Sequence, residues 1–270
     1  MIPKIIHYCW FSGEPLPKNA EECIASWKKF LPDYEIKKWT TEDFDMDSVP
    51  FVKDAYENKK WAYVTDYIRH YALCKFGGVY LDSDVLVLKD FSPLLDAGFV
   101  SAVEFHPGEE HIPYIKERTN EQGMRISKEI KVPGIGIQAA ILATIPNHPL
   151  NRKCLDFYST QSLSNVLENK YTAPTVISYN AEEYGFTYLD NEQNLSEGIH
   201  LYPSRIFANF NQVSSESFAV HCCYGSWVKK NLKQRIVDYL RLNSFSFIKK
   251  VFSIILSRKM DKIAKKMEIK

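Results

Sequence analysis

Residues 61–84 read WAYVTDYIRHYALCKFGGVYLDSD, and this stretch decides the fold class. Apolar side chains recur at helical spacing through its first part, until two glycines, Gly77 and Gly78, predict the end of a helix. The apolar run that follows at once predicts a buried strand, which stops at two aspartates, Asp82 and Asp84. A helix that leads through glycines into a buried strand is typical of an α/β domain.

The segments before this stretch alternate between strand and helix patterns. Residues 2–10 form an apolar run that predicts a buried strand, residues 18–30 place apolar side chains on one helical face, and residues 34–39 predict a second strand. Alternation of strand, helix and strand favours a mixed, mainly parallel sheet flanked by helices. We therefore expect one α/β domain over residues 1–230.

The pattern after the aspartates is less regular. Residues 106–134 are polar and contain several Pro and Gly residues, so they predict a long surface loop. Residues 149–170 predict a helix, and residues 171–220 predict a mixture of short strands and loops.

Composition and cysteine spacing favour an ordinary folded protein in a reducing compartment. Of the 270 residues, 45% are hydrophobic and 25% are charged, as is usual for soluble domains. The first residues do not resemble a signal peptide, and no apolar window has the length of a membrane span. The six cysteines show no disulfide framework, so we expect free thiols and a cytoplasmic location.

Basic residues concentrate at the C-terminus. Residues 231–270 contain eleven Lys or Arg against three acidic residues and predict a helical basic tail with one apolar face. Such a helix suits the anionic inner face of the cytoplasmic membrane, where the protein would be peripheral. The alternative is a helical hairpin that packs on the domain. Aromatic and basic residues do not interleave as in a nucleic-acid-binding motif, so we expect no nucleic-acid partner.

The two aspartates of the DXD are candidate metal ligands. An apolar setting penalises the charges of Asp82 and Asp84, and a divalent cation relieves that penalty. Mg²⁺ and Mn²⁺ bind carboxylate oxygens and often bridge them to substrate phosphates. An ordinary Asp-rich turn is the alternative. The preceding helix favours a functional site, because Asp66 and Arg69 lie three residues apart on one of its faces.

The stretch 61–84 resembles the DXD sugar-binding region of glycosyltransferase family 32, which includes bacterial capsular polysaccharide enzymes. It is also similar to the catalytic domains of the large clostridial glucosylating toxins. The opening residues 2–10, IPKIIHYCW, and the closing residues 221–227, HCCYGSW, resemble the family's first and last motifs. The resemblance therefore covers residues 1–230 and leaves out the basic tail.

The resemblance implies a GT-A fold and a metal-dependent, retaining hexosyltransferase. The donor would be a nucleotide sugar, with a UDP-hexose favoured over GDP-mannose. The acceptor would be a glycan or a lipid-linked glycan in surface polysaccharide synthesis, such as capsule. Because no second carboxylate in the sequence is placed as a covalent nucleophile, we expect a front-face substitution rather than a glycosyl-enzyme intermediate.

The resemblance also implies roles for individual residues. The catalytic set is Asp66, Arg69, Asp82 and Asp84. Asp84 would be the firmer ligand of Mn²⁺ or Mg²⁺, Asp82 would lie nearer the sugar and ribose, and His221 would complete the metal site, unless it is a core histidine. The residues that would contact the donor are Trp10, Asp66, Arg69, Tyr80, Asp82, Gly136, Gln138, Ser226 and Trp227.

The assignment of Trp10 carries an alternative, and that of Gln138 rests on a near match. Trp10 would offer a stacking face to the nucleotide base, but it could equally belong to the core. Gln138 stands where the toxin-like enzymes have an asparagine. Trp227 would donate its indole N–H to a phosphate, and Arg69 would offer its paired donors to another.

Two other function classes remain open on the residues alone. A haloacid-dehalogenase-like phosphatase also carries DxD after an apolar strand. That class places the motif near its N-terminus and usually has Thr or Val where this chain has Leu86. A non-catalytic carbohydrate-binding module would not need Asp66, Arg69 and both aspartates together.

Overall fold

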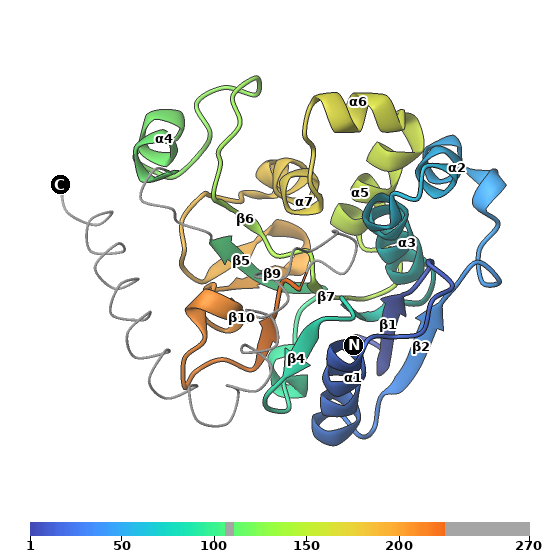
Figure 1. Cartoon of the computed structure of the whole chain (residues 1–270). Coiled ribbons are helices and arrows are strands. Elements are labelled where there is room, and N and C mark those ends of the chain that lie inside the picture. The colour runs from blue at the N-terminus through green and yellow to red at the C-terminus, as the bar shows by residue number, and fades with distance from the viewer. Residues whose placement is uncertain (106–110, 225–270) are drawn as a thin grey trace, which may run out of the picture.

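Strands and helices alternate at the start of the chain, as the pattern predicts (Figure 1). The computed structural model describes residues 1–105 and 111–224. The helices are α1 (Lys18–Phe30), α2 (Pro50–Glu57), α3 (Trp61–Phe76), α4 (His111–Arg118), α5 (Pro149–Thr160), α6 (Leu163–Glu168) and α7 (Ala173–Ala181). The strands are β1 (Ile5–Cys9), β2 (Glu35–Trp39), β3 (Gly78–Leu81), β4 (Val85–Val87), β5 (Phe99–Phe105), β6 (Ile135–Ile137), β7 (Ile141–Thr144), β8 (Gln193–Leu195), β9 (Ile199–Tyr202), β10 (Phe207–Asn209) and β11 (Ala219–His221).

The main sheet is mixed, with the strand order β2-β1-β3-β7-β5-β9-β8 and β6 paired to β5. β1 pairs in parallel with β2 and β3, and β5 pairs in parallel with β9. β7 runs antiparallel between β3 and β5, and β6 and β8 also pair antiparallel. The expectation of a mixed sheet is thus confirmed, but the parallel part is smaller than predicted, because β7 enters the centre in the opposite direction.

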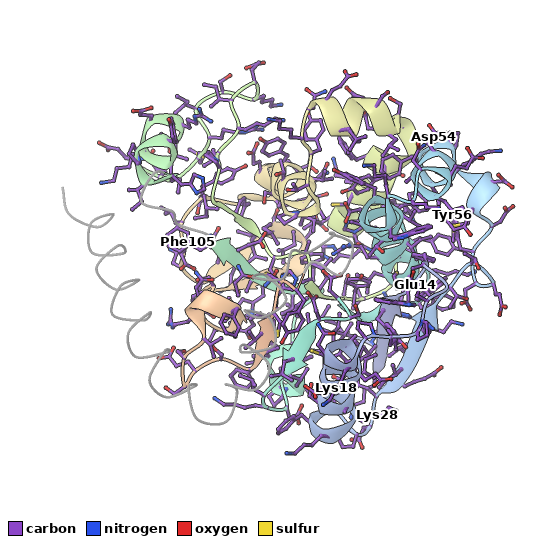
Figure 2. The ribbon with its side chains drawn as sticks, viewed as in Figure 1. Glu14, Lys18, Lys28, Asp54, Tyr56 and Phe105 are labelled. Carbon is purple, nitrogen blue, oxygen red and sulfur yellow. The ribbon has the colours of Figure 1, made fainter. Side chains whose placement is uncertain are left out.

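Helices cover both faces of this sheet (Figure 1). α2, α3, α5 and α7 lie on one side, and α1 lies on the other. Side chains of β3 and β7 alternate between the two cores, because successive strand residues point to opposite faces. Tyr80 and Leu142 pack with the first group of helices, whereas Val79 and Ile141 pack with Trp27 of α1. Lys18 and Lys28 of α1 point away from the sheet into solvent (Figure 2).

Two glycines allow α3 to turn directly into β3. Gly77 has φ +65° and Gly78 has φ +97°, which side chains rarely adopt. A Cβ on Gly78 would lie 2.5 Å from the carbonyl oxygen of Ile5 in β1. The glycine pair therefore lets β3 pair closely with β1 and brings the DXD to the edge of the sheet.

Residues 111–134, within the predicted surface loop of residues 106–134, contain a helix and a β-bridge. α4 forms within them and buries Ile115, and Thr119 pairs with Arg125 in a β-bridge. The Arg125 guanidinium lies 3.8 Å from the ring centre of Tyr179 and donates to Glu182. These contacts hold the segment against α7.

Two further predictions along the chain need correction. The predicted helix over residues 149–170 is two helices, because Ser162 caps a new one with its hydroxyl accepting from the backbone N–H of Asn165. The predicted strands and loops of residues 171–220 include helix α7. Among the helices of the described residues, none has the length and hydropathy that a membrane span requires. The predicted basic tail, residues 231–270, lies outside the described residues.

Candidate active site

The DXD leaves the sheet at the carboxyl end of β3, where ligands bind in open α/β folds. The backbone N–H of Asp82 donates to the carbonyl oxygen of Ala140 at 2.9 Å. The carbonyl oxygen of Asp84 accepts from the backbone N–H of Cys222 at 3.0 Å, just after β11. The turn that carries the two carboxylates is therefore fixed from both sides by backbone hydrogen bonds.

Asp82, Asp84 and His221 converge on one point. The Nε2 atom of His221 lies 3.4 Å from Oδ1 of Asp84 and 4.0 Å from Oδ2 of Asp82. One ligand atom from each residue lies within 4.8 Å of the other two. Two carboxylate oxygens and one imidazole nitrogen, all partly accessible to solvent, fit the donor set of a divalent cation. The structure thus brings together the three predicted metal ligands.

The charges of these residues are coupled. Burial raises the pKa of Asp84, but the charge of His221 and the hydrogen bonds that Asp84 accepts outweigh burial and hold its pKa below the ordinary value. One of those hydrogen bonds comes from the backbone N–H of Tyr224 at 2.8 Å. Burial lowers the pKa of His221, but the charge of Asp84 raises it well above the ordinary value. Asp84 and His221 therefore form an ion pair. His221 would have to lose a proton to hold a cation through this nitrogen.

Arg69 links helix α3 to the DXD. One Nη atom donates to Oδ1 of Asp66 at 3.0 Å, and the other donates to the carbonyl oxygen of Ala139 at 2.6 Å. The guanidinium also lies 3.6 Å from Oδ1 of Asp82, and its side chain is only 6% exposed. The Arg69 guanidinium, which was predicted to bind a phosphate, therefore contacts mainly protein acceptors. It fixes the positions of the Asp66 and Asp82 carboxylates.

Tyr80 also holds the carboxylate of Asp82. Its hydroxyl donates to Oδ1 of Asp82 at 2.7 Å, and its ring lies 4.7 Å from the Arg69 guanidinium carbon. Oδ1 of Asp82 is thus turned toward the protein, whereas Oδ2 faces His221. One oxygen of Asp82 is therefore held by the protein, and the other lies at the candidate metal site.

Asp66 is a buried carboxyl with an unusual proton affinity. Burial raises its pKa to about 7, against the lowering effect of the Arg69 charge, and the charge of Asp82 raises it further. Between the unfolded value near 4 and the folded value near 7, the native protein holds a proton that the unfolded chain has lost. Stability therefore falls as pH rises through this window.

Replacing Asp66 with asparagine is expected to remove this pH dependence. The wild-type free energy of unfolding should fall relative to Asp66→Asn between pH 4 and pH 7, by on the order of 4 kcal/mol for the full shift, and stay level above it. Urea unfolding of both proteins at a series of pH values measures the difference. Parallel profiles of the two proteins would show that Asp66 titrates normally.

Trp10 lies just after β1, at the same edge of the sheet as the DXD. Its backbone N–H donates to the carbonyl oxygen of Trp39 at 2.9 Å. Its indole N–H donates to the backbone carbonyl oxygen of Glu14, a residue labelled in Figure 2, at 2.6 Å. The side chain is half-buried, so the indole edge is held by the loop while part of the ring remains accessible. This placement is compatible with the predicted stacking on a base.

Gly136 and Gln138 have structural partners. A Cβ at Gly136 would lie 2.9 Å from the hydroxyl oxygen of Ser178, so packing against α7 requires the glycine. Gln138 is 1% exposed and donates to the carbonyl oxygen of Phe207 at 3.2 Å. Its amide oxygen is buried and has no hydrogen-bond partner among residues 1–105 and 111–224.

Some contacts of the site were not predicted, and two predicted residues cannot be placed. Ser226 and Trp227 lie outside the described residues. The Ala139 carbonyl and the Tyr224 N–H are backbone groups, so no residue type signals them. Cys223 also lies beside His221, with its sulfur 3.5 Å from the imidazole Nδ1. In the sequence, only the closeness of Cys223 to His221 in the run HCCYGSW indicated that it could lie at the site.

A mixed sheet covered by helices on both faces carries the DXD at the carboxyl end of its central strand β3, and the histidine at the end of β11 lies beside it. This is the arrangement of a GT-A fold. Residues 17–100 match the family model described as "Glycosyltransferase sugar-binding region containing DXD motif". Mouse xyloside xylosyltransferase 1 shares the fold, with a TM-score of 0.51 at 9% identity over 82% of this chain and 98% of that chain.

Curated relatives also match parts of the chain. A mannosyl phosphorylinositol ceramide synthase of Saccharomyces cerevisiae is 34% identical over 35% of this chain and 26% of its own length. An inositol phosphoceramide mannosyltransferase of Schizosaccharomyces pombe is 35% identical over 35% of this chain and 27% of its own length. The matched part of this chain thus spans about a quarter of each yeast relative. An uncharacterized glycosyltransferase of Acanthamoeba polyphaga mimivirus is 22% identical over 84% of both chains.

The family model and the two yeast relatives support the resemblance that the sequence suggested. Residues 17–100 therefore match the sugar-binding region of DXD glycosyltransferases, and the chain has a GT-A fold.

Proposed function

We propose that this chain transfers a hexose from a nucleotide sugar to a glycan or lipid-linked glycan, with a divalent metal held by Asp82, Asp84 and His221. The observation that carries the proposal is the convergence of these three side chains beside the buried Asp66–Arg69 pair. When bound, the metal would neutralise the donor diphosphate and make it a better leaving group.

Mn²⁺ is the ion that we propose. Carboxylate oxygens suit both Mg²⁺ and Mn²⁺, but an imidazole nitrogen among the ligands favours the softer transition-metal ion. The protein contributes a site whose carboxylates are fixed before the metal arrives. Asp84 is held by the Tyr224 N–H and Asp82 by the Tyr80 hydroxyl.

The remaining residues would position the donor sugar. Oδ1 of Asp66 accepts from Arg69, which leaves Oδ2 as the acceptor for a sugar hydroxyl. Arg69 keeps the Asp66 and Asp82 carboxylates in fixed orientations without reorganisation during transfer. Retention by front-face substitution, with the departing phosphate helping to deprotonate the acceptor, is part of the proposal. A β-linked product from an α-configured donor, read by NMR, would disprove retention.

The choice of donor and acceptor has two sources of support. The sequence favoured a UDP-hexose, whereas the names of both yeast relatives contain mannose and a ceramide lipid. GDP-mannose and a lipid-borne acceptor therefore have independent support. Surface polysaccharide synthesis remains the role that the family resemblance suggests.

A donor screen tests this function. The full chain is incubated with Mn²⁺ and, in turn, UDP-glucose, UDP-galactose and GDP-mannose, and release of UDP or GDP is followed. We expect slow hydrolysis of one donor that stops when EDTA is added and resumes with excess Mn²⁺. Release of phosphate from simple phosphomonoesters, with no nucleotide release, would favour the phosphatase alternative instead.

A further inference from the structure

Cys223 differs from the other five cysteines of the chain, which are buried. Its side chain is exposed, and its backbone has φ +52°, in the left-handed region that non-glycine residues rarely adopt. Such strain persists where the surrounding structure imposes it, often at functional sites. Here the turn directs Cys223 back toward His221, while the neighbouring Cys222 packs into an apolar cluster with Cys23.

The two nitrogens of His221 face different partners. Nε2 lies toward the carboxylates of Asp84 and Asp82. Nδ1 lies 3.5 Å from the sulfur of Cys223, within the range of a hydrogen bond to sulfur. A histidine binds metal through a nitrogen without a proton, so ligation through Nε2 requires the proton on Nδ1. Cys223 stands where that N–H must find an acceptor.

We propose that Cys223 is a positioning residue of the metal centre, whose sulfur accepts the Nδ1–H of His221 and thereby holds Nε2 toward the two aspartates. This inference rests on the proposed metal site. It follows a general rule, because a ligand histidine usually donates its second N–H to a partner that fixes its tautomer and orientation. Sulfur is a weak acceptor, but the left-handed turn compensates by presenting it at the ring.

A direct bond from Cys223 to the metal does not fit the geometry. The group whose ligand atoms lie close enough to share one ion contains Asp82, Asp84 and His221, and Cys223 is not among them. Its sulfur lies at the opposite nitrogen of the imidazole ring. The sulfur therefore acts on the site through His221.

Mn²⁺ binding by the full chain tests this role, measured as loss of the free Mn²⁺ signal in electron paramagnetic resonance. Cys223→Ala should weaken Mn²⁺ binding about tenfold, the lower end of the usual cost of losing such a partner. Cys223→Ser keeps an acceptor and should bind within about threefold of wild type. Ser215→Ala, which shortens an exposed side chain in the loop before β11, is the matched control and should bind as wild type.

The outcomes separate this inference from the proposed function. Melting temperatures should be equal for all four proteins, because the substituted side chains are exposed, so a change in affinity reports the site rather than the fold. If wild type binds Mn²⁺ and Cys223→Ala binds it equally well, Cys223 has no positioning role while the metal site stands. If Cys223→Ser loses as much as Cys223→Ala, the acceptor role is wrong. If wild type binds no Mn²⁺, the metal site and this role both fail.

Discussion

Asp84→Asn is expected to lower kcat for nucleotide release about a thousandfold and to abolish measurable Mn²⁺ binding. Of the two aspartates, Asp84 has the shorter approach to the imidazole of His221, 3.4 Å against 4.0 Å. Its low pKa keeps it charged at neutral pH, despite burial, because of the His221 charge and the backbone N–H of Tyr224. Charge stabilisation by a metal is worth several kcal/mol, and about 4 kcal/mol corresponds to a thousandfold in rate.

The Asp84→Asn variant removes the negative charge of the side chain but keeps its size and shape. It retains an oxygen that can accept from the Tyr224 N–H, so the turn should remain folded. Asp33→Asn is the control, because Asp33 is an exposed partner of Lys4 and such surface pairs contribute little. Nucleotide release and free Mn²⁺ are measured for both variants. Activity of Asp84→Asn within tenfold of wild type, at saturating Mn²⁺, would place the metal centre elsewhere.

Local sequence signals predicted the elements that carry the DXD. The helix of residues 61–76 and its end at Gly77 were predicted correctly, because helical periodicity and the positive φ of glycine act within a few residues. The direction of β7 was not predictable in this way. The apolar pattern of a short strand does not indicate whether the strand runs parallel or antiparallel to its neighbours. The place of β7 between β3 and β5 depends on pairing with residues far from it in the chain.

Two missed helices share a physical cause. α7 contains Pro174 in its first turn, and α4 contains Pro113 near its start. Proline reads as a breaker in sequence, but the first turn of a helix tolerates it because its missing N–H would have had no partner there. Proline therefore marks helix beginnings as well as loops, and only the following residues distinguish the two.

The sequence could predict the contacts of the site that involve side chains, but not those that involve backbone groups. Asp82, Asp84 and His221 were assigned together from the family resemblance, and the structure brings them within one ligand cluster although His221 is far away in sequence. The role of Arg69 was less predictable. Its partner, the Ala139 carbonyl, is a backbone group, so the sequence could not show that its fork is already engaged.

Arg69→Met is expected to lower the free energy of unfolding by about 3–5 kcal/mol at pH 8, because it leaves a buried carboxylate without its cation. Methionine retains apolar bulk beside Tyr80, so the loss comes mainly from charge and hydrogen bonds. Arg69 lowers the pKa of Asp66, so its removal lets that pKa rise above about 7. At pH 5 Asp66 is then neutral, and the loss should be clearly smaller than at pH 8.

Urea unfolding of wild type, Arg69→Met, Asp66→Asn and the double variant at both pH values measures this coupling. The double variant should be more stable than Arg69→Met at pH 8, because the uncompensated buried charge is gone. Arg205→Met is the control: Arg205 pairs with Glu216 at the exposed surface, so its loss should cost less than about 0.5 kcal/mol. An equal loss for Arg69→Met at both pH values, with additive effects of the two substitutions, would mean that Arg69 stabilises the site by packing on Tyr80 rather than by holding the Asp66 carboxylate. Helix α3 would then be held in place by its apolar contacts rather than by this ion pair.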